Sequence, residues 1–180
     1  IGELYSIQTP GAPAYRSIMA RYFRAVGTDT IKQRDLFNRV SGRMGDGQRN
    51  HLPIFQGFET TKNAWNVILE AAEFHYRPGQ FTTFAAYEWS LSGLRPNGRL
   101  GAHYHRNIIF KDMVVPDYPI SALEADTPEK LWAWLEEISK AGAEVMAIPH
   151  NTNLAGGGMF LGTDQNGNPI DSDYAGLSNR

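Results

Sequence analysis

The hydrophobic residues of this chain follow two spacings, which together predict a mixture of helices and strands. Recurrence at every third or fourth residue is typical of an amphipathic helix, whereas short runs of β-branched and aromatic residues are typical of strands. Helices are predicted at residues 14–26, 31–40, 60–76 and 128–141. Strands are predicted at residues 81–89, 105–110 and 144–148. The segments between them are rich in glycine and proline and predict loops.

The helix at residues 128–141 has the most complete set of signals. Thr127 is a favourable N-cap, Pro128 occupies the first helical position, and Gly142 follows the last turn. The apolar face that this helix should bury consists of Leu131, Trp134, Leu135 and Ile138.

A strand, a helix and a strand in succession predict an α/β fold with at least some parallel pairing. We expect residues 81–88 and 144–148 to be neighbouring or near-neighbouring parallel strands, with helix 128–141 packed outside them. Chemistry in such folds gathers at the C-terminal ends of strands. Glu88 and His150 both occupy such ends.

The composition narrows the function classes. Hydrophobic residues make up 42% of the chain and charged residues 20%, so the chain can form a packed core. The net charge is −2 and no basic patch stands out, which argues against nucleic acid as the main partner. No apolar run is long enough to span a membrane. Cysteine is absent, so any metal must bind imidazole and carboxylate groups. The lack of cysteine is compatible with both exported and cytoplasmic proteins, with an exported or periplasmic location slightly favoured.

Three residues are the main candidates for chemistry, and each has a structural alternative. Glu88 closes an apolar strand, where a carboxylate needs a neutralising partner such as a metal or Arg106. His105 forms an HxH pair with His103, which would put both imidazoles on one face of a strand, although nearby histidines are often only loop polarity. His150 ends a buried strand and could equally be a satisfied core histidine.

Weaker candidates surround these three. Asn151 and Asn153 carry amides suited to hydrogen bonds with a ligand or with their own loop. The run Gly156-Gly157-Gly158 could expose backbone N–H groups to an anion, but more often such a run is a mobile loop. We interpret His51 and His75 as structural.

The motifs FTTFAAYEWS, HYHRNIIF and EVMAIPHNTNLAGGGMF resemble the bacterial family catalogued as domain of unknown function 3604 (DUF3604). The resemblance covers residues 78–176, and the opening IGELY and TPG add to it. That family in turn resembles the PHP (polymerase and histidinol phosphatase) metallohydrolase superfamily.

The resemblance implies a distorted seven-stranded (β/α)7 barrel that holds two or three Mn, Zn or Fe ions. It places the metal-bridging glutamate at Glu88 and the later histidine ligands at His105 and His150. The HxH that begins the family's ligand order and the DxH that ends it are missing. We therefore expect residues 1–180 to be a single partial domain, a central fragment with a helical or irregular insertion at about 14–60, completed by the remaining segments of the parent chain.

The function implied is a metal-dependent hydrolase that acts on a small-molecule ester, and the superfamily implies a phosphate ester. Besides the three ligands, His103, Arg106, Asn151 and Asn153 are the predicted substrate-binding residues, although Arg106 could instead pair with a carboxylate.

Two other functions stay open. A non-catalytic module could keep the fold and use its cleft for binding. A metal-free carbohydrate-active domain could use Glu88 as an acid and Trp89 as a sugar platform, and its second carboxylate would be Asp112 or Glu124.

Overall fold

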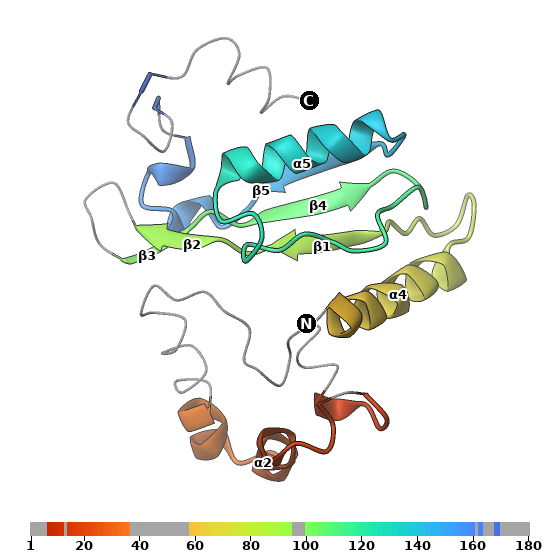
Figure 1. The fold of residues 1–180 in the computed structure, drawn as a ribbon, viewed down its shortest axis with the longest axis vertical. Coiled ribbons are helices and arrows are strands. Elements are labelled where there is room, and N and C mark those ends of the chain that lie inside the picture. The colour runs from red at the N-terminus through yellow and green to blue at the C-terminus, as the bar shows by residue number, and fades with distance from the viewer. Residues whose placement is uncertain are drawn as a thin grey trace. The chain divides into compact units, whose positions relative to one another are not determined.

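The computed structural model describes residues 7–12, 14–36, 58–94, 100–160, 162–163 and 168–169 (Figure 1). The chain divides into two compact units, Ile1–Val67 and Ile68–Arg180. Helix α4 (Phe58–His75) contains the boundary between them. Among the described residues, no helix combines the length and apolar character needed to cross a bilayer.

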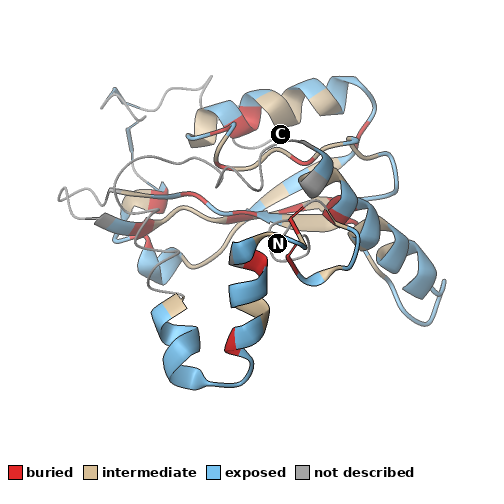
Figure 2. Cartoon of the chain, turned by 60° about the horizontal axis from the view of Figure 1, so that its bottom comes forward, coloured by how far each residue is buried: buried red, intermediate tan, exposed pale blue. Residues whose placement is uncertain are grey.

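The first unit holds short helices around a small apolar cluster. Helix α2 (Ile18–Val26) starts after Ser17, whose side chain accepts a hydrogen bond from the Ala20 amide at 3.0 Å. Ala20 packs with Ile7 and Ala14, all almost fully buried. Figure 2 shows α2 largely exposed, with buried residues at a few positions. Residues 30–36 are also helical, and the rest of the helix predicted at 31–40 lies outside the described residues.

The second unit is built on a three-stranded antiparallel sheet. Its strands are β1 (Ala86–Trp89), β4 (Arg106–Phe110) and β5 (Val145–Pro149), in the order β1-β4-β5. Both hydrogen-bonded pairs are antiparallel. Because β4 runs against both of its neighbours, β1 and β5 point in the same direction with β4 between them.

The prediction of a (β/α)7 barrel is wrong. The described strands form the three-stranded sheet and a separate two-stranded ribbon of β2 (Ser92–Leu94) and β3 (Leu100–His103), and no barrel closes among the described residues. The physical reason lies in the segment after β1. A parallel neighbour needs a crossover that is usually helical, whereas this segment folds into the β2–β3 ribbon and returns the chain antiparallel. The expected parallel pairing is wrong, because both hydrogen-bonded pairs of this sheet are antiparallel. The expectation that the first and last strands are near-neighbours with the same direction is confirmed by β1 and β5.

The two faces of the sheet differ in cover. On one face, Trp89, Ile108 and Phe110 are fully buried. Helix α5 (Pro128–Lys140) lies along the sheet, and its Trp132 ring is 5.5 Å from the buried Arg106 guanidinium carbon (Figure 1). On the other face, Met146 of β5 is 58% exposed. Thr127 caps α5 as predicted, accepting from the Lys130 amide at 3.3 Å.

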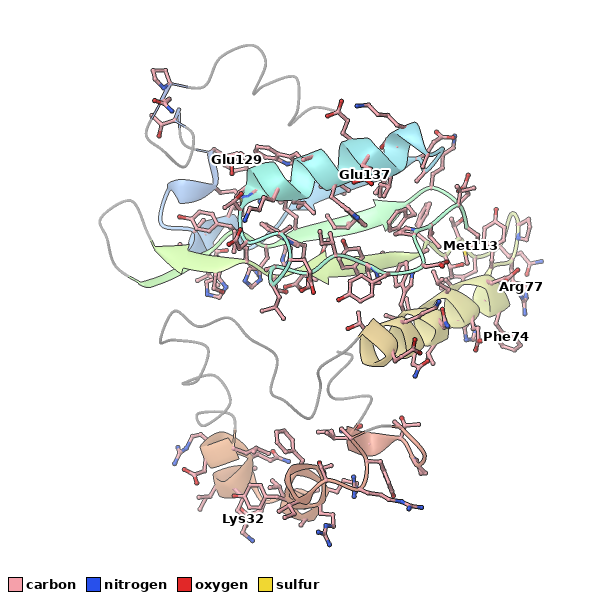
Figure 3. All side chains as sticks on the ribbon, viewed as in Figure 1. Lys32, Phe74, Arg77, Met113, Glu129 and Glu137 are labelled. Atoms are coloured by element: carbon pink, nitrogen blue, oxygen red, sulfur yellow. The ribbon has the colours of Figure 1, made fainter. Side chains whose placement is uncertain are left out.

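One exposed aromatic ring lies at a helix end. Figure 3 shows Phe74 near the C-terminal end of α4, where its side chain is 69% exposed. Arg77 turns back onto this helix end and donates to the carbonyl oxygens of Phe74 and Tyr76 at 2.6 and 2.8 Å. The turn predicted at Pro78-Gly79 is present, with Gly79 at φ 74°.

Trp89 ties β1 to the segment before α5. Its ring is fully buried, and Nε1 donates to the Ala125 carbonyl at 3.0 Å. Trp89→Phe should lower the free energy of unfolding by about 1–3 kcal/mol, because that buried carbonyl loses its donor. Trp89→Ala should cost about 3–5 kcal/mol, because it also leaves a cavity. Urea denaturation monitored by circular dichroism measures both losses.

The control for these variants is Phe160→Ala, which removes a ring that is 72% exposed and should change the free energy of unfolding by under about 0.5 kcal/mol. Similar losses at Trp89 and Phe160 would contradict the anchoring role of Trp89.

Candidate metal centre

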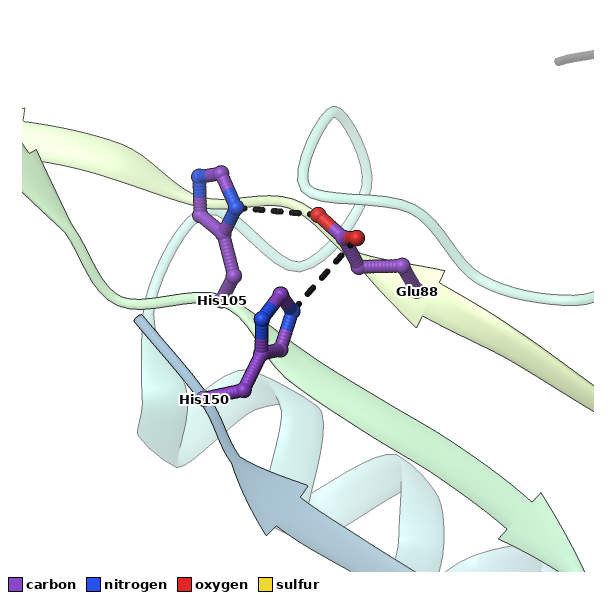
Figure 4. Close-up of side chains that lie close together, drawn as sticks. All are labelled: Glu88, His105 and His150. Carbon is purple, nitrogen blue, oxygen red and sulfur yellow. Dashed lines mark ion pairs between the residues drawn. The ribbon is translucent and has the colours of Figure 1, made fainter. Parts of the chain in front are cut away.

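Three predicted residues converge at one rim of the sheet. Glu88 is near the C-terminal end of β1, His150 directly follows β5, and His105 directly precedes the reversed strand β4. The strand directions therefore bring all three to the same edge, and the His150 amide donates to the His105 carbonyl at 3.2 Å. One possible ligand atom from each residue lies within 4.8 Å of the other two (Figure 4).

The Glu88 carboxylate faces a different imidazole with each oxygen. Oε1 is 2.9 Å from Nδ1 of His105, and Oε2 is 3.4 Å from Nε2 of His150 (Figure 4). Ligands held about 2.0–2.2 Å from one ion lie roughly 3–3.5 Å from one another. The two distances from Glu88 to the imidazoles are therefore close to those between neighbouring ligands of a metal, and the three ligand atoms all lie within 4.8 Å of one another.

His150 has an unsatisfied atom at this position. Its Nε2 is buried and makes no hydrogen bond among the described residues, since the 3.4 Å contact with Glu88 lacks hydrogen-bond geometry. Buried polar nitrogen atoms are normally satisfied, and an exception needs an explanation. A cation between Nε2 and the carboxylate would supply the missing partner.

Electrostatics favour the ligand forms of two of the side chains. Partial burial opposes the charge on Glu88, but a hydrogen bond from Ser90 Oγ at 2.5 Å and the nearby His105 and His150 outweigh it and hold the pKa of Glu88 below its ordinary value. Burial lowers the pKa of His105, with smaller contributions from His103 and His150, against the opposing effect of Glu88. An ionised carboxylate and a neutral imidazole are the forms that bind metal.

His103 lies beside the group, with its ring centroid 4.8 Å from that of His105. Its Nδ1 is also buried without a hydrogen-bond partner among the described residues. Asn151 follows His150 in the left-handed conformation, at φ 56° and ψ 32°, and its carbonyl accepts from the Leu154 amide. Asn153 is exposed in the same turn. The substrate-binding roles of these three residues stay predictions.

Arg106 points away from the group. It pairs across the ladder with Trp89 on the covered face, is 5% exposed, and donates to the Tyr104 carbonyl at 2.9 Å. The Glu88 carboxylate contacts the two histidines, whereas Arg106 lies on the opposite face of the sheet with Trp89. The predicted contact of Arg106 with a substrate gains no support from this position.

Sequence reasoning missed three polar neighbours of the group. Ser90 donates to Glu88, Ser92 Oγ lies 3.4 Å from Nε2 of His105, and Asn107 is directly opposite Glu88 in the β1–β4 register. Strand alternation offered a signal, because Ser90 is two residues from Glu88 and Asn107 two from His105.

Other residues weighed from the sequence lie outside the group. His75 is exposed at the end of α4, and His51 is outside the described residues. Trp89 cannot serve as a sugar platform, because its ring is fully buried. The carboxylates of Asp112 and Glu124 accept hydrogen bonds from their own loops, at Val114 and Ser121. The carbohydrate-active alternative therefore loses its platform residue.

The chain matches the family described as "Protein of unknown function (DUF3604)" over residues 5–180. It therefore belongs to this family, as the motifs predicted. No curated protein and no solved structure matched the chain.

The serine next to Glu88 provides a test of the site's electrostatics. Ser90→Ala should raise the pKa of Glu88, because the ionised carboxylate loses a hydrogen bond that favours it. Carboxyl ¹³C NMR during a pH titration of the metal-free chain measures this shift.

Ser121→Ala is the matched control. Ser121 lowers the pKa of Glu124 in the same way, so its removal should raise the pKa of Glu124 and leave that of Glu88 unchanged. If Ser90→Ala leaves the pKa of Glu88 unchanged, the hydrogen bond from Ser90 to Glu88 is absent in solution.

Proposed function

We propose that Glu88, His105 and His150 bind a divalent metal ion and that the protein is a metal-dependent hydrolase. The observation that carries the proposal is the buried Nε2 of His150, which has no hydrogen-bond partner among the described residues and lies 3.4 Å from a carboxylate oxygen. An ion pair with Glu88 alone would not offset the cost of burying Nε2 without a hydrogen bond. The Glu88 side chain is 40% exposed, and exposed ion pairs contribute little stability.

The donor set supports a particular range of metals. Two imidazoles and a carboxylate suit Zn, Mn or Fe rather than Ca or Mg, which prefer oxygen ligands. His105 would bind through Nδ1 and His150 through Nε2, the atoms that face Glu88. With its two oxygens directed to different imidazoles, Glu88 could hold one ion or bridge two.

The chemistry proposed is ester hydrolysis. A divalent ion in such a site lowers the pKa of bound water and stabilises negative charge on an ester oxygen. The lowered pKa of Glu88 favours its negatively charged form, and the lowered pKa of His105 favours its neutral form. The resemblance to PHP enzymes favours a phosphate ester as substrate, with further ligands supplied by the parent protein.

Metal binding is the first test. Isothermal titration of the metal-free chain with Zn²⁺ or Mn²⁺ should show a site that His150→Ala weakens by at least about tenfold, since a ligand and the preorganisation of its neighbours are lost. His75→Ala, which removes an exposed histidine outside the group, is the matched control and should leave the affinity unchanged. Equal affinities in all three proteins would refute the proposed site.

Activity distinguishes the hydrolase from a non-catalytic binding module. The parent protein supplied with Mn²⁺ should hydrolyse p-nitrophenyl phosphate, lose that activity with a chelator, and recover it when Mn²⁺ returns. His150→Ala should abolish it, whereas this chain alone, with only part of the ligand set, should be inactive. Metal binding without any ester hydrolysis would favour the binding module, and hydrolysis that resists chelation would exclude the metal mechanism.

A further inference from the structure

The residue between the two histidines of the HYH motif lies in a slot made by two glycines. A Cβ atom built on Gly93 would stand 3.2 Å from Cε2 of Tyr104, and one built on Gly158 would stand 2.4 Å from its hydroxyl oxygen and 2.8 Å from its Cε1. Cε1 and Cε2 are on opposite edges of the ring, and the hydroxyl is at its tip. The ring therefore lies close to both glycines, and a methyl group at either position would press on it.

The three consecutive glycines have different reasons to be glycine. Gly156 and Gly157 have φ values of 61° and 87°, a backbone conformation that side chains disfavour. Gly158 is not among the positive-φ residues, and what it provides is space for Tyr104. In the run Gly156-Gly157-Gly158, which the sequence offered as an anion site, the third glycine therefore packs against the Tyr104 side chain.

The backbone of Tyr104 is fixed on both sides. Its amide donates to the Leu91 carbonyl at 2.8 Å, and its own carbonyl accepts from the buried Arg106 at 2.9 Å. Arg106 is packed in turn near the rings of Trp89 and Trp132, at 5.7 and 5.5 Å. Any displacement of Tyr104 acts directly on His105, the next residue in the chain.

Gly158 is linked to the residue after His150 by a series of turns. Successive turns lead from one to the other, with backbone hydrogen bonds from Leu154 to Asn151, from Ala155 to Thr152 and from Gly158 to Ala155. A displacement of Gly158 is therefore transmitted through these turns to the loop that starts at His150.

We propose that Tyr104 is a positioning residue, which clasps the loop after His150 against the segment before His105 and so sets the separation of the two imidazoles. The contact of the Tyr104 ring with Gly158 joins the two segments at a second point, beyond the His150–His105 backbone hydrogen bond. Two points of attachment restrict rotation of one segment against the other, which one hydrogen bond does not. The effect of this clasp on metal binding rests on the proposed metal site.

The test is a double-mutant cycle on metal affinity. Gly158→Ala should weaken Zn²⁺ binding by about tenfold, the usual scale for residues that orient metal ligands. In a Tyr104→Leu background, which removes the ring edge, adding Gly158→Ala should change the affinity by less than about twofold. Gly93→Ala, with its longer contact, should have a smaller effect than Gly158→Ala. Thermal unfolding of each metal-free variant shows whether it folds. If Gly158→Ala does not fold, Gly93→Ala replaces it in the double-mutant cycle with Tyr104→Leu.

Gly162→Ala is the matched control, because Gly162 has open space around its Cβ position and no positive φ is recorded for it. It should leave Zn²⁺ affinity unchanged. Equal losses from Gly158→Ala in the wild-type and Tyr104→Leu backgrounds would overturn the clasp, and so would wild-type affinity in the single variant.

A metal-independent measurement separates this inference from the proposed function. Amide hydrogen exchange of Tyr104 and His150 in the metal-free chain should accelerate in Gly158→Ala and not in Gly162→Ala. If the wild-type chain binds no metal but these amides respond, the metal site fails and the clasp stands. If metal binds and neither affinity nor exchange responds to Gly158→Ala, the clasp fails and the metal site stands.

Discussion

The position of β4 between β1 and β5 is the constraint on which the candidate site depends. Because β4 is antiparallel to both neighbours, the end of β1, the start of β4 and the end of β5 share one rim of the sheet. Each ligand candidate occupies one of those three positions. A one-residue slip of β4 would turn His105 to the opposite face, so the register that pairs Glu88 with Asn107 also decides whether the three side chains can meet. The buried Ile108 and Phe110 fix that register by packing on the covered face.

One face of the sheet is buried and the other is accessible, and this difference separates the residues that pack in the core from those of the candidate site. Trp89 and Glu88 are adjacent in β1 and point to opposite sides, one fully buried and the other 40% exposed in its side chain. The same alternation divides β4, where Arg106 is buried and Asn107 is partly accessible. Anchoring and ligand geometry are thus coupled through the backbone, because movement of a buried residue shifts the adjacent polar one.

Local signals in the sequence predicted helix α5, the strand cores and the three residues that converge at the rim, although Trp132 is buried in α5 where Trp134 was expected. Capping at Thr127 and the strand-end positions of Glu88 and His150 are short-range features, and local chemistry determines them. The barrel and the parallel pairing were wrong, because the β2–β3 ribbon is formed by a glycine-rich stretch with little strand character and changes how the chain returns to the sheet. The role of Gly158 was also beyond local reasoning, since it depends on a ring 54 positions earlier in the chain.

A crystal structure of the chain soaked with Zn²⁺ or Mn²⁺, with anomalous diffraction recorded at the metal edge, tests the central claim most directly. The account predicts an anomalous peak at the sheet rim, about 2.0–2.2 Å from a Glu88 oxygen, Nδ1 of His105 and Nε2 of His150. A saturated crystal with no peak at this rim, or with metal only at His51 or His75, would contradict it.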